Sequence, residues 1–183
     1  MTRIDSVSAQ PDRVGRYTVR FNDGTVMRLY RQTVEDFGIY SGAELSAQQL
    51  EALISQAGAM SAKMRAVRIV SATNVSKSDL ELRLIRKGED AQQAKDAVQW
   101  MSDLDLLDDQ RTAEQIVRKC IGKGYGLARA KQALYEKRIP KQYWQAVLED
   151  YPDQIEKIVS YLRAHLGEQW QERDLRRVYL LPI

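Results

Sequence analysis

The feature that most constrains the fold of this 183-residue chain is an internal repeat of 50 residues. Shifting the sequence by that length superimposes apolar and basic positions of one segment on the next. The first set is Leu80, Leu84, Lys87, Ala97 and Val98, and it falls on Ala130, Leu134, Lys137, Val147 and Leu148. Each unit would hold three helices, and stacked units of this kind bury one another's apolar faces. The repeat predicts a mainly α-helical chain of tandem three-helix, helix-turn-helix-like units that form an elongated array.

Apolar periodicity indicates where these helices lie. Two segments show the i, i+3, i+4, i+7 spacing of a helix buried on one side. They are Ala94, Ala97, Val98 and Met101, and Ala113, Ile116, Val117, Cys120 and Ile121. Ser76 followed three residues later by Asp79 is typical of a helix start, and Gly88 is expected to end that helix.

The first 58 residues have a different pattern. Residues 17–21 alternate apolar and polar side chains, Asn22-Asp23-Gly24 supplies turn chemistry, and residues 25–30 resume an extended run, which predicts a β-hairpin. A further strand is expected at 4–9, with short helices near 32–37 and 47–56. The predicted division is a small β-rich α+β module at 1–58, three-helix repeats at 59–107 and 108–150, and a truncated or degenerate third repeat at 151–183.

Composition excludes several classes of function. Cys120 is the single cysteine and His165 the single histidine, so a Cys-His dyad or a zinc site lacks ligands. Charges interrupt every helix-like segment, and no window reaches the roughly 20 apolar residues of a membrane span. The first thirty residues contain no run like a signal peptide. We expect a protein of the reducing cytoplasm with no catalysis, no cofactor, no metal and no membrane contact.

The charge is unevenly distributed along the chain. Residues 89–109 hold seven acidic residues against one lysine, whereas residues 110–141 hold nine basic residues against two acidic ones. This polarity favours docking onto an object with its own charge pattern, such as a nucleoprotein. The alternative is that solvated helix faces happen to segregate.

The glycines of Gly122-Lys123-Gly124-Tyr125-Gly126 do not predict a phosphate-binding loop. A helix precedes them instead of a strand, and no Gly-Lys-Ser/Thr ending follows. We interpret them as the end of one helix and the tight reversal into the next. Any function then lies in the flanking cations.

The clearest basic stripe is formed by Arg83, Arg86 and Lys87, at i, i+3 and i+4 of one predicted helix. Like charges at this spacing repel by a few tenths of a kcal/mol per pair, which an anionic partner would offset. Arg118 lies opposite the apolar stripe of its helix, and Lys123 extends from the glycine loop. A merely solvated face is the alternative.

Three motifs resemble, in order and spacing, the bacterial RecX regulatory proteins over about residues 60–165. They are Ser76-x-x-Asp79-Leu80-x-x-x-Leu84-x-x-Lys87-Gly88, then Leu106-Leu107-Asp108-Asp109-x-x-x-Ala113, then Gly124-Tyr125-Gly126-x-x-Arg129-x-x-x-x-Leu134-x-x-Lys137-Arg138-Ile139. The β-rich N-terminus is similar to the extension of many members. The chain departs from the family pattern at Asp79, where glutamate is usual, at Thr112, where an aromatic is usual, and at Arg138, where glycine is usual.

The resemblance implies a non-enzymatic modulator of the RecA recombinase in homologous recombination, DNA repair and the SOS response. Such proteins consist of three-helix repeats, lie in the groove of the RecA filament on single-stranded DNA, and suppress its ATPase, strand-exchange and coprotease activities. We expect a monomer that contacts single-stranded DNA directly or through RecA. The candidate contacts are Arg83, Arg86, Lys87, Arg118, Lys123, Arg129, Lys131, Lys137 and Arg138.

Two other functions remain open from the residues alone. A helix-turn-helix regulator would read one duplex site with a single recognition helix, although the basic residues are spread over several units. A generic protein-binding α-solenoid would show no salt-dependent affinity for nucleic acid.

Overall fold

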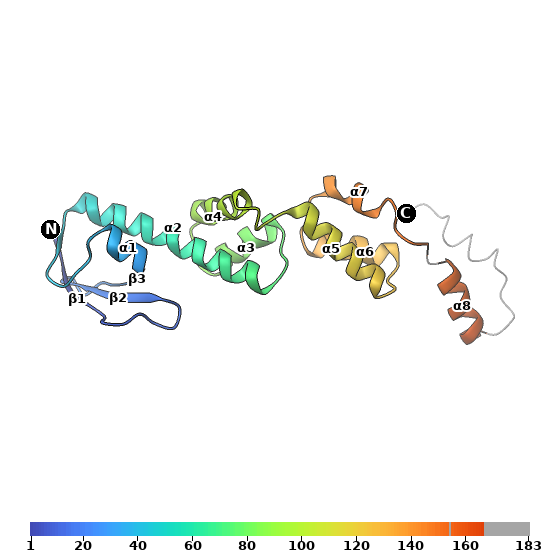
Figure 1. The fold of residues 1–183 in the computed structure, drawn as a ribbon, viewed down its shortest axis with the longest axis horizontal. Coiled ribbons are helices and arrows are strands. Elements are labelled where there is room, and N and C mark those ends of the chain that lie inside the picture. Colours follow the sequence, from blue (N-terminus) through green and yellow to red (C-terminus); the bar gives the residue numbers. More distant parts are fainter. Residues whose placement is uncertain (154, 167–183) are drawn as a thin grey trace. The chain divides into compact units, whose positions relative to one another are not determined.

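The computed structural model describes residues 1–153 and 155–166. This part of the chain is mainly helical, with a small antiparallel sheet at its N-terminal end, as the sequence predicts (Figure 1). The chain divides into two compact units, Met1–Thr112 and Ala113–Ile183. That the units stack into an elongated array stays a prediction.

The sheet has the strand order β3-β2-β1-β4. Its strands are β1 (Thr2–Val7), β2 (Arg16–Phe21), β3 (Val26–Tyr30) and β4 (Glu44–Leu45). The predicted hairpin is confirmed, because β2 and β3 pair in antiparallel register from Arg16 opposite Tyr30 to Arg20 opposite Val26. Gly24 takes a φ of +84° in the connecting turn, and Asp23 Oδ1 accepts the Thr25 N–H at 2.8 Å. The two-residue strand β4 is too short to show a pattern and was not predicted.

Two helices cover this sheet. Helix α1 (Arg31–Asp36) confirms the helix expected near residues 32–37, and α2 (Ala47–Ala72) follows β4. The core of the module joins inward-facing strand residues to α2, and its fully buried members include Ile4, Val19, Leu29 and Leu53.

The length of α2 corrects the expected helix at residues 47–56. A capping box starts the helix, with Ser46 Oγ accepting the Gln49 N–H at 3.1 Å and Gln49 Oε1 accepting the Ser46 N–H at 2.9 Å. The helix then continues through Gly58 to Ala72. Gly58 therefore lies inside the helix and does not end it. The Gln93 side chain of a later helix occupies the place that a Cβ at position 58 would take. The expected boundary at 58 therefore falls inside a continuous helix, and the division into four domains stays a prediction.

The first three-helix unit consists of the second half of α2 with α3 (Lys77–Arg86) and α4 (Ala91–Asp103). Alanines on α2 and α4 let these helices approach closely around Leu80, Leu84 and Met101. The buried members are Ala62, Ala66, Val75, Leu80, Leu84, Ala94, Ala97, Val98, Met101 and Leu107. Ser76 Oγ accepts the Asp79 N–H at 3.1 Å, so the predicted start of α3 is confirmed.

A further set of helices follows. It begins with α5 (Asp109–Gly122), whose residues up to Thr112 belong to the first compact unit. The rest are α6 (Leu127–Glu136), the 3-10 helix η1 (Lys141–Tyr143), α7 (Trp144–Leu148) and α8 (Ile155–Leu166). Helices α3 and α6 have equal lengths and bounds that differ by the 50-residue repeat. Leu134 is fully buried, as is its counterpart Leu84. Trp144 packs against this core and donates its Nε1–H to the Ile139 carbonyl at 3.0 Å.

Helices α3 and α6 end in the same hydrogen-bonded turn around a left-handed residue. After α3 the Gly88 N–H bonds to Ile85 O at 2.9 Å, and Gly88 has a φ of +90°. After α6 the Arg138 N–H bonds to Tyr135 O at 2.9 Å, and Arg138 has a φ of +55°. A side chain with a Cβ is strained in this region, whereas glycine is not. The usual family glycine at this position therefore has a conformational reason, and Arg138 retains the turn under strain.

Replacing Arg138 with glycine should raise the free energy of unfolding of the second unit by about 1 kcal/mol, because the left-handed strain disappears. Urea denaturation followed by circular dichroism measures the change. The matched control is Gly88→Arg, which introduces the same strain after α3 and should lower stability by a similar amount. Equal stability of wild type and Arg138→Gly would show that the turn is unstrained.

Candidate functional site

Two of the three cations predicted as a stripe on α3 share one surface. The Arg83 guanidinium forms an ion pair with Asp79, with Nη2 and Oδ2 2.9 Å apart. Arg83 and Lys87 line a cavity with α2, whereas Arg86 is exposed and does not line it. Arg83 and Lys87, at i and i+4, therefore line the same cavity, and Arg86, at i+3, lies outside it.

This cavity, which we call the basic pocket, has a volume of about 510 Å³ and lies entirely within the first unit. Its lining residues come from the loop before β2 and the start of β2, and from α2 and α3 with their C-cap residues. They are Val14, Arg16, Arg65, Arg68, Ile69, Ala72, Thr73, Arg83 and Lys87. Five of these nine carry a positive charge and none is acidic, so the lining favours an anion.

Sequence reasoning missed three of these five cations. Arg16 lies at the start of β2, and Arg65 and Arg68 lie on α2, far in sequence from Arg83. Only the spacing of Arg65 and Arg68, at i and i+3 of one helix, was available as a signal. That spacing alone does not indicate a shared surface with α3, because the packing of α2 against α3 is not a local property of the sequence.

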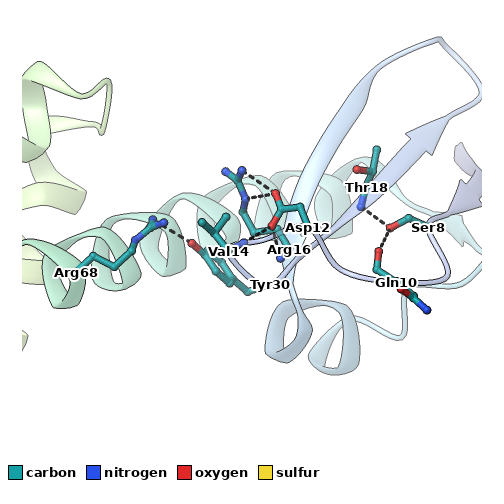
Figure 2. Close-up of polar contacts among 8 residues, drawn as sticks. All are labelled: Ser8, Gln10, Asp12, Val14, Arg16, Thr18, Tyr30 and Arg68. Carbon is teal, nitrogen blue, oxygen red and sulfur yellow. Dashed lines mark hydrogen bonds and ion pairs between the residues drawn. The ribbon is translucent and has the colours of Figure 1, made fainter.

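The loop that carries Val14 to the basic pocket is held by Asp12 (Figure 2). Its Oδ1 accepts the N–H groups of Val14 at 3.0 Å and Arg16 at 2.9 Å, and its Oδ2 accepts two guanidinium N–H groups of Arg16 at 3.0 and 2.8 Å. These bonds, first of all that from the Arg16 backbone, lower the pKa of Asp12 to about 2.

The lowered pKa predicts how the loop responds to acid. Because the folded pKa lies below the unfolded value of 3.8, the contribution of Asp12 to stability is complete above pH 3.8 and is lost as pH falls toward 2. The Asp12 carboxyl carbon, followed by NMR, should titrate with a midpoint near 2. In Arg16→Gln the midpoint should rise only part of the way to 3.8, because the backbone bonds remain. A wild-type midpoint near 3.8 would contradict these contacts.

The six predicted cations of the second unit are mostly exposed. Arg118, Lys123, Arg129, Lys131 and Arg138 are exposed, and Lys137 is half-buried. Arg129 Nη1 lies 3.3 Å from Glu136 Oε1. The pKa of Glu136 is lowered, first by the hydrogen bond from the Gln132 side chain and then by Arg129. The Lys123 ammonium lies 5.7 Å from the centre of the Tyr125 ring, within the range of a cation–π contact.

Two cavities of the second unit each contain members of this set. Arg138 lines one of about 460 Å³ together with Lys141, Tyr135 and Trp144. Lys131 lines another of about 350 Å³, which also contacts Trp144. The nine cations are divided between the two compact units, and that they form a single surface stays a prediction.

The acidic pair at the start of α5 binds backbone N–H groups at the starts of two helices, α5 and α3. Asp108 Oδ1 accepts the N–H groups of Gln110 at 2.8 Å and Arg111 at 3.1 Å. Asp109 Oδ1 accepts the Lys77 N–H at 2.8 Å, and burial raises the pKa of this carboxyl. In residues 1–153 and 155–166 no group of three or more His, Cys, Asp or Glu side chains is placed to hold a metal ion. No helix among the same residues combines the length and apolar character of a membrane span.

Known proteins match both the sequence and this fold. Residues 108–148, which contain the six cations of the second unit, match the family model described as RecX, second three-helix domain. Regulatory protein RecX from Clostridioides difficile (strain 630) is 24% identical over 181 residues, a match that spans 98% of this chain and 84% of that protein. The chain resembles the RecX regulatory proteins. The match covers nearly the whole described chain, including the N-terminal module.

Other RecX proteins match over shorter stretches. Regulatory protein RecX from Clostridium perfringens (strain SM101 / Type A) is 22% identical over 139 residues, which cover 76% of this chain and 65% of that protein. The RecX of Vibrio campbellii (strain ATCC BAA-1116) is 29% identical over 97 residues, 53% of this chain and 63% of that protein. A crystal structure of regulatory protein RecX superimposes with a TM-score of 0.70 at 20% identity, covering 97% of this chain and 90% of the other. This likeness shows the shared fold.

Proposed function

We propose that the chain is a non-enzymatic regulator of the RecA recombinase. It binds the groove of the RecA filament on single-stranded DNA and suppresses ATP hydrolysis, strand exchange and coprotease activity. The observation that carries the proposal is the match of residues 108–148 to the second three-helix domain of RecX. The match includes Arg118, Lys123 and Arg129, which are among the candidate contacts.

The state of the cations supports a binding role. Arg86, Arg118 and Lys123 are exposed, and none of them forms an ion pair with a described residue. Cations that are not neutralised within the fold are available to an acidic partner surface or to phosphates. Helical packing also fixes the backbone from which Arg86 and Arg118 project. In this proposal the protein acts as a monomer in the cytoplasm, in homologous recombination, DNA repair and the SOS response.

The experiment that tests the proposal measures ATP hydrolysis by RecA from the same organism on long single-stranded DNA. The purified protein should lower the steady-state rate at substoichiometric amounts, and strand exchange and repressor cleavage should fall with it. No effect at equimolar protein would reject the proposal. Tight binding to one duplex sequence over random duplex at the same salt would instead indicate a helix-turn-helix regulator.

A further inference from the structure

The basic pocket brings together cations from three separate segments. Arg16 comes from the β-rich module, Arg68 from the C-terminal part of α2 and Lys87 from the end of α3. Figure 2 shows Arg68 reaching the Tyr30 hydroxyl, and Asp12 bonded to Val14 and Arg16, which line the same pocket as Arg68. The N-terminal module and the first three-helix unit therefore both contribute to one charged lining.

Three of the five cations are neutralised by carboxylates outside the lining. Arg16 pairs with Asp12 at 2.8 Å, Arg65 with Glu89 at 2.6 Å and Arg83 with Asp79 at 2.9 Å. That list leaves Arg68 and Lys87, neither of which pairs with a carboxylate among the described residues. The partial negative charges at the ends of α2 and α3 offset roughly half a charge each, so an excess of positive charge remains.

The geometry of the unpaired arginine is set before any ligand arrives. Arg68 donates from Nη2 to the Tyr30 hydroxyl at 3.4 Å and from Nε to the Met64 carbonyl at 3.3 Å. Tyr30 is buried at the end of β3, so it anchors the guanidinium to the sheet. Asp12 holds Arg16 on the other strand of the hairpin. A fixed guanidinium loses less conformational freedom on binding than a free one.

The chemistry of the lining selects a phosphate group. Guanidinium forks match the oxygens of a phosphate, and a lysine ammonium adds a point charge. The pocket is open to solvent, and none of its lining residues is aromatic, so the lining offers no ring on which a base could stack. Val14, Ile69 and Ala72 offer apolar contact instead, which suits a sugar.

We propose that the basic pocket binds a backbone phosphate of a single-stranded DNA strand, with Arg68 and Lys87 as its direct contacts. The pocket reads charge and not sequence, and it gives the N-terminal module a direct part in DNA binding, independent of RecA. The inference rests on the proposed function for the choice of DNA as the strand. A free nucleotide or inorganic phosphate offers the same chemistry, and the experiment separates these sources.

The experiment follows binding of a fluorescein-labelled 20-nucleotide single strand to the full chain by anisotropy, without RecA, between 0.05 and 0.5 M NaCl, approximately. Each phosphate contact to a single strand contributes about 0.7 to the slope of log K against log salt. Arg68→Gln with Lys87→Gln should therefore reduce the slope by about 1.4 and weaken binding roughly 25-fold at about 0.1 M salt. The matched control is Arg28→Gln with Lys95→Gln, which removes one exposed arginine and one exposed lysine away from the pocket.

The outcomes are distinct. A loss confined to the pocket variant supports the proposal, as does restored binding in Arg68→Lys with Lys87→Arg, provided circular dichroism shows intact folds. Equal slopes for pocket and control variants would overturn it, and so would no binding of DNA by the wild type. Competition by millimolar ATP or inorganic phosphate, with no binding of the strand, would assign the pocket to a small anion and also overturn it. The RecA ATPase assay tests the proposed function separately. If the protein inhibits RecA but does not bind DNA by itself, the pocket proposal is wrong and the proposed function stands.

Discussion

Replacing Leu134 with alanine should lower the free energy of unfolding of the second unit by about 3 kcal/mol while leaving the first unit unchanged. Leu134 is fully buried at the centre of the core formed with Ala113, Val117 and Ile139. Buried Leu→Ala changes cost about 2–5 kcal/mol because a cavity remains. Hydrogen exchange read by mass spectrometry in urea reports each unit separately, since peptides from α3 and α6 do not overlap.

The matched control is Leu84→Ala, the same position one repeat earlier and equally buried. It should destabilise the first unit by a similar amount and leave protection of α6 as in the wild type. The prediction depends on the separate cores of the two units, Leu84 belonging to one and Leu134 to the other. Loss of protection in both units from either substitution would show that they unfold as one cooperative body.

Reversing the charge of Arg83 and Lys87 together, as Arg83→Glu with Lys87→Glu, should raise the concentration needed for half-inhibition of the RecA ATPase by about tenfold or more. The change replaces two cations of the basic pocket with carboxylates, which repel an acidic partner or a phosphate. Both positions are at least partly exposed, so the helix can form in the variant. The measurement is ATP hydrolysis on single-stranded DNA against protein concentration.

The control for this variant is Arg28→Glu with Lys95→Glu, which makes the same change in net charge at exposed positions on β3 and α4. It should change half-inhibition by less than about threefold, since screening weakens distant charges. If the pocket variant inhibits like the wild type and retains its helical circular dichroism, Arg83 and Lys87 form only a solvated face of α3.

Much of the helical fold could be predicted because its signals are local. The apolar spacing, the Ser76 start and the Gly88 end all lie within a few residues of the helices they define, and the 50-residue repeat predicted the equivalence of α3 and α6. The end of α2 could not be found this way. Gly58 is a helix breaker by propensity, and only the packing of Gln93 from α4 explains its place inside a helix.

The candidate site was predicted in part for the same reason. The spacing of Arg83 and Lys87 at i and i+4 is a local property of the sequence, and both residues line the basic pocket. That these cations are binding contacts stays a prediction. Arg16 and Arg68 join that surface only because the hairpin packs beside α2, and no local pattern contains this information. Tyr30, the partner of Arg68, likewise lies 38 residues away in sequence, whereas Asp12, the partner of Arg16, lies only four residues before it.

Helix α2 makes the module and the first three-helix unit mechanically inseparable. Its N-terminal turns bury Leu53 in the module, and its C-terminal turns bury Ala62 and Ala66 in the three-helix core. A shortened protein that starts at residue 59 would lose the Ser46 cap and Leu53, and its first helix would begin with unsatisfied N–H groups beside Ala62. Truncation at that point should therefore destabilise the three-helix unit as well as delete the sheet. A loss of activity in such a fragment could not be assigned to the sheet alone.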